Sequence, residues 1–251
     1  MLHAVGAGAP PAPEIEDADV ETSSEDYARR FAGAVGAWFL DVQARTTLSL
    51  LSRWPGARVL DVGGGHAQTA GPLAQAGHDV TVVGSSEACQ ERLQPLIREG
   101  RVAFRAADLL HLPWETGAFD VCLALRLLPH VVRWPGLIEE LCRVARCAVV
   151  VDYPTRRSAN ALAEAFFGLK KGVEGNTRPY TVFREQQIRD AFASQGFRAT
   201  GRRPQFFFPM VVHRALGRAP VSRALEGAAS ALGLVRALGS PVILRAERGS
   251  D

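Results

Sequence analysis

A run of three glycines, directly after a short apolar segment, is the feature of this chain most suggestive of chemistry. Arg58–Val62 is followed by Gly63, Gly64 and Gly65. Consecutive glycines permit positive φ angles and let a ligand approach the backbone closely, whereas a plain strand-to-helix bend needs only one. Asp61 precedes the first glycine by two residues. Its carboxylate would repel a pyrophosphate and suits a ligand that carries an ammonium group.

The spacing of the glycines separates two classes of cofactor. The dinucleotide-binding fingerprint G-x-G-x-x-G requires a glycine at the sixth position counted from Gly63, and this chain has Gln68 there. An open parallel sheet binds its ligands at the carboxyl ends of its strands, which is where this turn would lie. The turn therefore favours a cofactor that is not a dinucleotide.

Four segments resemble, in order and spacing, the motifs of the class I S-adenosylmethionine-dependent methyltransferases. These segments are Val59–Gly65, Ala106–Leu109 with Leu112–Pro113, Gly117–Val121 with Leu128–Val131, and Leu137–Val144. The resemblance runs from about Arg58 to Asp152. It implies a doubly wound, Rossmann-like α/β sheet, mostly parallel with an antiparallel last strand and helical cap elements. It also implies S-adenosylmethionine as methyl donor and S-adenosylhomocysteine as product.

The same resemblance implies which residues contact the cofactor. The glycine turn would hold the methionine end of the cofactor, and the segment at Asp108 its adenine. The expected contacts are Asp61, Gly63, Gly64, Gly65, Gly84, Ser85, Asp108, Leu109 and Leu125. The family usually ends its second strand with an acid that accepts both ribose hydroxyls, but this chain has Gly84 and Ser85 there. Either Ser85 or Glu87 takes that role, or the backbone alone holds the ribose in a reshaped site.

Two residues are candidates for the chemical step. Methyl transfer from a sulfonium needs alignment and, for a hydroxyl or a carbon acid, a base that takes the proton. His130, just past the expected fourth strand, is the first candidate base, and its alternative role is to tie its loop by hydrogen bonding. Tyr153, at the end of the fifth strand, would orient the acceptor or simply pack its ring. His66 is expected to shape the glycine loop or to lie beside the cofactor, rather than to act as a base.

Two other methyltransferase subclasses lack their characteristic residues. The exit of the expected fourth strand, Leu123–Pro129, has no Asn/Asp-Pro-Pro-aromatic motif for a planar amino nitrogen. A catechol-type magnesium site needs several clustered oxygen ligands, and the fifth strand ends with Asp152 as its single acid. We therefore expect neither DNA methylation nor a metal.

Substrate contacts are expected from segments outside the shared core. The predicted substrate residues are Tyr27, Arg126, Arg178 and Tyr180. A basic cluster lies in and beside the insertion 156–180, and it consists of Arg156, Arg157, Lys170, Lys171, Arg178 and Arg184. The cluster is either a solvated surface or, with Arg178 first, a holder of a carboxylate, phosphate or lipid headgroup. The apolar helical stretch 211–238 would form core or a lid, with a membrane-surface helix as the alternative.

Short apolar runs alternate with helical patterns and predict a parallel sheet covered by helices on both faces. Strands are expected over 58–62, 79–83, 101–106, 119–125, 147–152, 197–208 and 241–247. Helices are expected over 69–76, 86–98, 135–145 and 184–195, with one or two more between 27 and 54. A capping box formed by Ser23 and Asp26 would begin the first of these.

The charge of the 251-residue chain is unevenly distributed. The formal net charge is +3, yet residues 1–26 contain seven acidic residues and no Lys or Arg. We expect residues 1–22 to be a disordered arm and residues 23–251 a single methyltransferase domain. That domain would carry a helical cover (23–55), a substrate-side insertion (156–180) and a helical insertion (209–239). Apolar runs of about 18 residues and a secretory signal are both missing, so we expect no transmembrane segment and a cytoplasmic location.

These patterns predict a methyltransferase of secondary metabolism that acts on a small, hydrophobic molecule. O-methylation is slightly favoured over C-methylation, because His130 near the fourth strand suits deprotonation of a hydroxyl. Two alternatives stay open. One is a protein of this fold with altered or lost methyl transfer. The other is an RNA-modifying or RNA-binding protein that uses the basic body of the chain, although nucleic acid is not the expected partner.

Overall fold

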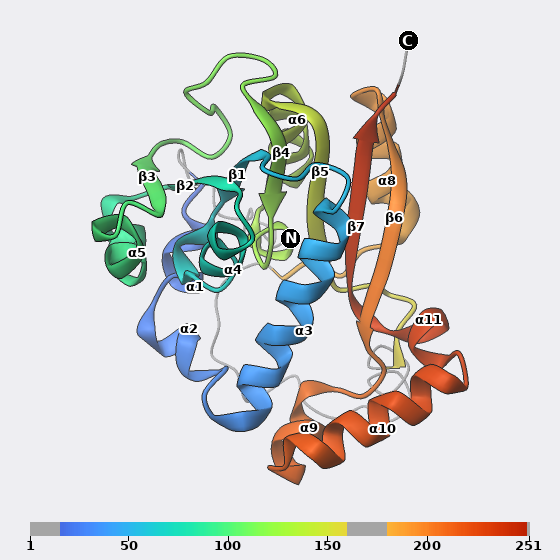
Figure 1. The fold of residues 1–251 in the computed structure, drawn as a ribbon. Helices are drawn as coiled ribbons and strands as arrows, with labels where there is room; N and C mark the ends of the chain where they lie inside the picture. Colours follow the sequence, from blue (N-terminus) through green and yellow to red (C-terminus); the bar gives the residue numbers. More distant parts are fainter. Residues whose placement is uncertain (1–15, 160–179, 250–251) are drawn as a thin grey trace, which may run out of the picture.

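In the computed structural model, which describes residues 16–159 and 180–249, seven strands form one sheet in the order β3-β2-β1-β4-β5-β7-β6. The strands are β1 (Arg58–Val62), β2 (Asp79–Gly84), β3 (Val102–Ala106), β4 (Phe119–Ala124), β5 (Ala145–Tyr153), β6 (Phe197–Phe206) and β7 (Ser240–Arg248). β7 pairs antiparallel with β5 and β6, and the pairings among β1 to β5 are parallel. The fold expected from the sequence is confirmed (Figure 1).

Helices cover both faces of the sheet (Figure 1). The helices between the strands are η1 (Gly64–His66), α4 (Ala70–Gln75), η2 (Glu87–Leu93), α5 (Gln94–Arg98), η3 (Leu128–His130), α6 (Trp134–Val144) and α8 (Glu185–Ser194), where η denotes a 3-10 helix. The N-terminal helices are α1 (Ala18–Thr22), α2 (Glu25–Arg29) and α3 (Gly33–Leu51). Apolar residues of α3, α4 and α5 pack on one face of the sheet, and those of α6 and α8 on the other.

Strand β1 shows why the sheet could be predicted from local patterns. Leu60 and Val62 point into the core under α6 and α8, whereas Val59 points into the core under α3 and α4. All three side chains are buried. Successive residues of a strand face opposite sides, and a parallel sheet is covered on both sides, so its strands read as continuous apolar runs.

The strand order reverses between β1 and β4, because β2 and β3 lie to one side of β1 and β4 lies to the other. Such a switch point opens a crevice at the carboxyl ends of the strands, where open α/β sheets bind ligands. The glycine turn lies at the end of β1, and the Gly63 N–H donates a hydrogen bond of 2.8 Å to the carbonyl of Val83 in β2. The chain therefore places its glycine turn at the crevice.

The N-terminal segment differs from its prediction. A disordered arm was expected through residue 22, but residues 18–22 form α1, and Asp19 is fully buried. The reason is a long-range contact, since Asp19 hydrogen-bonds Ser85 at the end of β2. Residues 1–15 lie outside the described residues. The helix start is also shifted by one residue, because Ser24, not Ser23, caps α2 by accepting the Tyr27 N–H at 3.2 Å.

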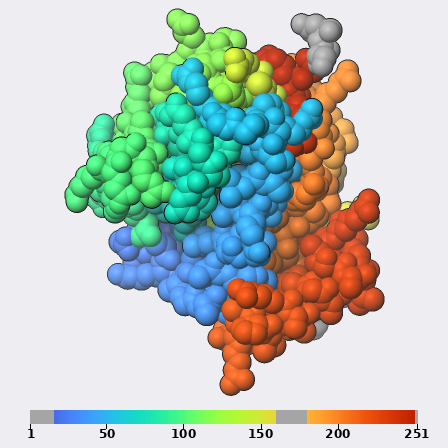
Figure 2. Space-filling view, in the orientation of Figure 1, coloured from blue at the N-terminus to red at the C-terminus, as the bar shows by residue number. Residues whose placement is uncertain are grey.

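The helical insertion between β6 and β7 consists of α9 (Met210–Leu216), α10 (Ala219–Ala231) and α11 (Leu234–Leu238). It packs beside α3, and Figure 2 shows its orange and red helices against the blue N-terminal ones. Trp38 and Phe39 of α3 meet Phe206 at this junction, with ring centroids 5.4 and 4.3 Å apart respectively. The insertion thus forms one wall of the region at the lower ends of β6 and β7 in Figure 1.

A buried polar clamp fastens this insertion. The Glu226 carboxylate of α10 accepts the N–H groups of Phe207 and Phe208 and pairs with the ring Nε2 of His213, all at 2.9 Å. Glu226→Ala leaves these groups without their partner, so we expect a loss of about 2 kcal/mol or more in the free energy of unfolding, measured in urea. Arg223→Ala, on an exposed face of the same helix, is the control and should change stability by less than about 0.5 kcal/mol. Equal midpoints for the two variants would contradict the clamp.

Candidate active site

A cavity of about 240 Å³ lies where β5 ends and β7 begins. Its apolar and aromatic lining comes from α2, α3, the helical insertion, the ends of β5, β6 and β7, and the loops. It consists of Tyr27, Phe31, Phe39, Pro129, Tyr153, Pro154, Phe206, Phe208, Met210, Pro241 and Ile243. Its polar lining consists of Gln43, Arg126, His130, Asp152, Tyr180, Gln205 and Ser240. An apolar wall with a few converging polar groups is typical of a small-molecule site.

Asp152, near the end of β5, is the acid of this cavity. Its Oδ1 accepts the Arg126 backbone N–H at 2.5 Å. Burial raises the pKa of Asp152 to about 6, although that N–H and the Arg126 charge act in the opposite direction. Sequence reasoning did not select this residue as a base. The signal was the acid at the end of a buried strand.

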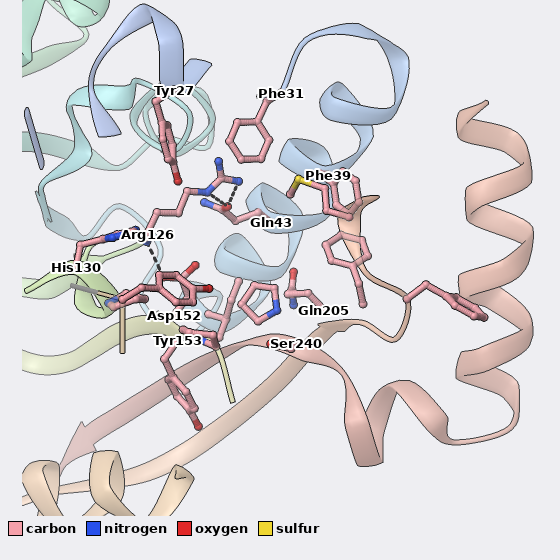
Figure 3. A pocket seen from close by; sticks show the side chains of 18 residues that line it. Tyr27, Phe31, Phe39, Gln43, Arg126, His130, Asp152, Tyr153, Gln205 and Ser240 are labelled. Carbon is pink, nitrogen blue, oxygen red and sulfur yellow. Dashed lines mark hydrogen bonds between the residues drawn. The ribbon is translucent and has the colours of Figure 1, made fainter. Parts of the chain in front are cut away.

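Arg126, a predicted substrate residue, lies on the wall of the cavity. Its backbone has φ +61°, a conformation uncommon outside glycine. The guanidinium donates to Oε1 of Gln43 and, at 2.6 Å, to Oε1 of Gln68, and it stacks 3.9 Å from the ring centroid of Phe31. Tyr27, also a predicted substrate residue, lies on the other side of the guanidinium (Figure 3). Held on several sides, Arg126 presents a fixed positive charge.

The two predicted catalytic residues lie differently. His130, at the end of η3, lines the cavity, and its ring centroid is 5.5 Å from that of Tyr180. Tyr153 is adjacent to Asp152 in β5, so the two side chains face opposite sides of the sheet. Tyr153 also lines the cavity, and its ring is buried against Phe183 (Figure 3). A role for Tyr153 in orienting the acceptor stays a prediction.

The basic insertion is described in part. Tyr180 lines the cavity and is 62% exposed, whereas Arg178 lies outside the described residues, as do Lys170 and Lys171. The described members Arg156, Arg157 and Arg184 line a second groove of about 630 Å³ together with Arg189, Arg202 and Arg236. They are therefore not part of the cavity that contains Asp152.

The described residues contain no group of three or more His, Cys, Asp or Glu side chains arranged to hold a metal ion. Across the same part of the chain, every helix is too short or too polar to cross a membrane.

The glycine turn itself closes over Asp61. Gly63 has φ +72°, and a Cβ at Gly64 would lie 2.3 Å from Oδ2 of Asp61. Neither carboxylate oxygen has a hydrogen-bond partner within the described structure, and burial raises the pKa of Asp61 to about 7. Buried polar groups without partners are rare and call for an explanation. A positively charged ligand would give the Asp61 carboxylate a partner.

Comparisons with known proteins decide the family. A family model described as a methyltransferase domain matches residues 60–148. The demethylmenaquinone methyltransferase of Beutenbergia cavernae is 30% identical over 192 residues, which make up 68% of this chain and 76% of that protein. The chain belongs to the class I S-adenosylmethionine-dependent methyltransferases. S-adenosylmethionine is therefore its cofactor.

Two further proteins are similar to this chain over different lengths. An O-methyltransferase of Pyrenophora dematioidea is 31% identical over 111 residues, so this chain spans 41% of the length of that relative. The crystal structure of magnesium protoporphyrin IX methyltransferase from Synechocystis with bound S-adenosylhomocysteine superposes with a TM-score of 0.60. The two sequences are 20% identical, and the superposition covers 89% of this chain and 93% of the Synechocystis chain. This likeness shows the fold.

The residues at the turn fit the methyltransferase cofactor at its methionine end. Asp61 offers an unpaired carboxylate for the ammonium group, and the glycines leave room for close approach. Of the other predicted contacts, Leu109 and Leu125 are buried. Asp108 is already engaged, because its oxygens accept the Leu110 N–H at 2.9 Å and face Nδ1 of His111 at 2.7 Å. Burial acts to raise the pKa of Asp108, but these two hydrogen bonds lower it on balance.

The end of β2 is where the chain departs from the family pattern. A Cβ at Gly84 would lie 2.6 Å from Cβ of Cys89, so the loop leaves no room for a side chain there. The Ser85 N–H and hydroxyl both donate to Asp19 of α1, at 2.8 and 2.6 Å. Gly84 and Ser85 are thus shielded by the N-terminal helix, a contact with no local sequence signal.

The burial of His66 bears on its predicted role at the glycine turn. His66 is buried, and burial lowers the pKa of its ring to about 3, with the Arg126 charge acting in the same direction. Its Nδ1 accepts the Gln68 N–H at 3.1 Å. A histidine with so low a pKa is a poor base at neutral pH, so the loop-shaping role fits His66 better.

Proposed function

We propose that this methyltransferase moves the methyl group of S-adenosylmethionine to a hydroxyl group of a small, mostly apolar molecule held in the cavity. The observation that carries the proposal is Asp152, a carboxylate with a pKa of about 6 on the wall of an aromatic cavity. Such a group is ionised at pH 7.5 and is a stronger base than an ordinary aspartate. It can therefore accept the proton that a hydroxyl loses as its oxygen is methylated.

The cavity walls support an acceptor with an apolar body. Aromatic side chains form several of them, and the N-terminal helices and the insertion close the site on two sides. The volume of about 240 Å³ suits a small molecule more than a polymer. One relative is named an O-methyltransferase, and this name supports an oxygen atom as the methyl acceptor.

The polar groups give the acceptor an orientation. Arg126 is fixed by Gln43 and Gln68, and its charge faces the same space as Asp152. A hydroxyl that loses a proton develops negative charge, and a preorganised guanidinium stabilises it. His130, at the edge of the cavity, is the second candidate base, and Arg126 is proposed as the group that holds the acceptor oxygen.

The proposal is tested by offering the chain S-adenosylmethionine with a labelled methyl group together with a metabolite extract of its host. We expect a labelled small molecule whose NMR spectrum shows a methoxy group. A labelled C-methyl or N-methyl product would overturn O-methylation, and label in the RNA fraction would favour the RNA alternative. Binding of S-adenosylhomocysteine without any labelled product would favour a protein of this fold with lost or altered transfer.

A further inference from the structure

The N-terminal helix α1 lies directly on the glycine turn. The Cβ of Asp19 is 3.4 Å from the position of a Cβ on Gly63, and Oγ of Ser23 is 2.3 Å from the position of a Cβ on Gly65. Gly63 and Gly65 are both buried. The surface that the glycines keep clear for a ligand is therefore covered by residues of the same chain.

Asp19 also binds the groups at the end of β2. Its carboxylate accepts the Ser85 N–H at 2.8 Å, the Ser85 hydroxyl at 2.6 Å and the Cys89 thiol at 3.3 Å. The side chain is fully buried. Ser85 directly follows the carboxyl end of β2, beside the switch point where ligands of such sheets bind, and Cys89 lies in the next helix, η2. α1 thus satisfies polar groups that face the cofactor crevice.

With α1 docked on the glycine turn, the Asp61 carboxylate has no hydrogen-bond partner among the described residues. This carboxylate is buried under the same turn on which α1 packs. A docked α1 brings a second carboxylate, Asp19, to the turn and supplies no positive charge. The cofactor would bring an ammonium group, so the turn is better matched to the cofactor than to α1.

We propose that α1 is a strap that occupies part of the cofactor crevice and leaves it when S-adenosylmethionine binds. The strap has five residues: Asp19 accepts hydrogen bonds from Ser85, Ala18 is buried in the core, and Glu21 pairs with Arg30 at 3.5 Å. α2 is anchored separately, because Glu25 pairs with Arg92 of η2 and Ser24 caps the helix. Residues 18–23 can therefore detach while α2 stays in place. The docked strap lowers the apparent affinity for the cofactor by the fraction of molecules in which it is open.

The direct test is hydrogen exchange of the full chain with and without S-adenosylhomocysteine. The N–H groups of Val20, Ser23 and Ser24 donate to the carbonyls of Asp17, Asp19 and Glu21 and report on α1. We expect these amides to exchange faster when the ligand binds, while the peptide 60–68 becomes more protected. Greater protection of 18–24 with the ligand would overturn the strap and make α1 a lid over the bound cofactor.

A pair of variants tests the same point by affinity. Asp19→Ala removes the anchor and should tighten S-adenosylhomocysteine binding by about tenfold or more in calorimetry, as should deletion of residues 1–22. Asp26→Ala, an exposed acid that pairs with Arg29 on α2, is the matched control and should leave affinity unchanged. Unchanged or weaker binding by both the Asp19 variant and the deletion would overturn the proposal. No acceptor is involved, so the result does not depend on the proposed O-methylation.

Discussion

Asp152→Asn should lower kcat/KM for methyl transfer by about 10²- to 10⁴-fold, the range expected when a general base is removed. The asparagine Oδ1 can still accept the Arg126 N–H that Asp152 accepts at 2.5 Å. The loop that carries Arg126 should therefore keep its conformation, and affinity for S-adenosylhomocysteine should stay within about twofold of the parent value, since ground-state binding is unaffected.

The pH profile separates a base from a structural carboxylate. Burial raises the pKa of Asp152 to about 6, so kcat/KM of the parent should rise with pH through that value as the carboxylate ionises. Asp152→Asn should lose this acidic limb. His130→Gln is the informative comparison, because it removes the other candidate base. If the limb vanished in His130→Gln and persisted in Asp152→Asn, His130 would be the base.

Asp61→Asn should weaken S-adenosylhomocysteine binding by about 10- to 100-fold, which corresponds to loss of a hydrogen bond between charged groups. The Asp61 carboxylate lies beneath the glycine turn, and neither of its oxygens has a hydrogen-bond partner among the described residues. Because burial raises the pKa of Asp61 to about 7, cofactor affinity of the parent should also increase with pH through neutrality. Calorimetry at pH 6 and pH 8 measures both effects. An affinity that is unchanged by the substitution would remove Asp61 from the site.

The same substitution should flatten the pH dependence of stability in the absence of cofactor. The folded-state pKa of Asp61, about 7, lies above the ordinary value of 3.8. The folded chain therefore holds an extra proton between these values, and stability falls as pH rises, by about 1.4 kcal/mol per unit at most. His66, with its pKa lowered to about 3, acts in the opposite direction over the acidic range. The difference in the free energy of unfolding between Asp61→Asn and the parent, measured across pH, isolates the contribution of Asp61. Parallel curves of stability against pH would contradict a raised pKa for Asp61.

The sheet was predictable because its evidence is local. Strands β1, β2, β4 and β5 are short apolar runs covered on both faces, whereas the edge strand β3 exposes Ala103 and Arg105. The expected boundaries fall within two residues of the observed ones for all five strands. The glycine turn was predictable for the same reason, since Asp61 and Gly63 to Gly65 are contiguous. Strand-like and turn-like patterns of this kind need no knowledge of distant contacts.

The cavity was less predictable because distant residues assemble it. Asp152 and Tyr153 look equivalent in the sequence and both line the cavity, but the alternation of side chains in β5 turns the Tyr153 ring toward Phe183. Both faces of β5 are buried, so hydrophobic patterning does not say which residue faces the site. Asp19 was assigned to a disordered arm, because the residue that orders it, Ser85, is 66 positions away.

The most direct test is a crystal structure of the chain with S-adenosylhomocysteine. We expect the ligand at the end of β1, with its ammonium group within hydrogen-bond distance of Asp61 and its sulfur facing the cavity that contains Asp152. We also expect α1 to be displaced from Gly63. A ligand bound elsewhere, or a sulfur turned away from Asp152 with α1 still docked on the glycine turn, would contradict this placement of the cofactor.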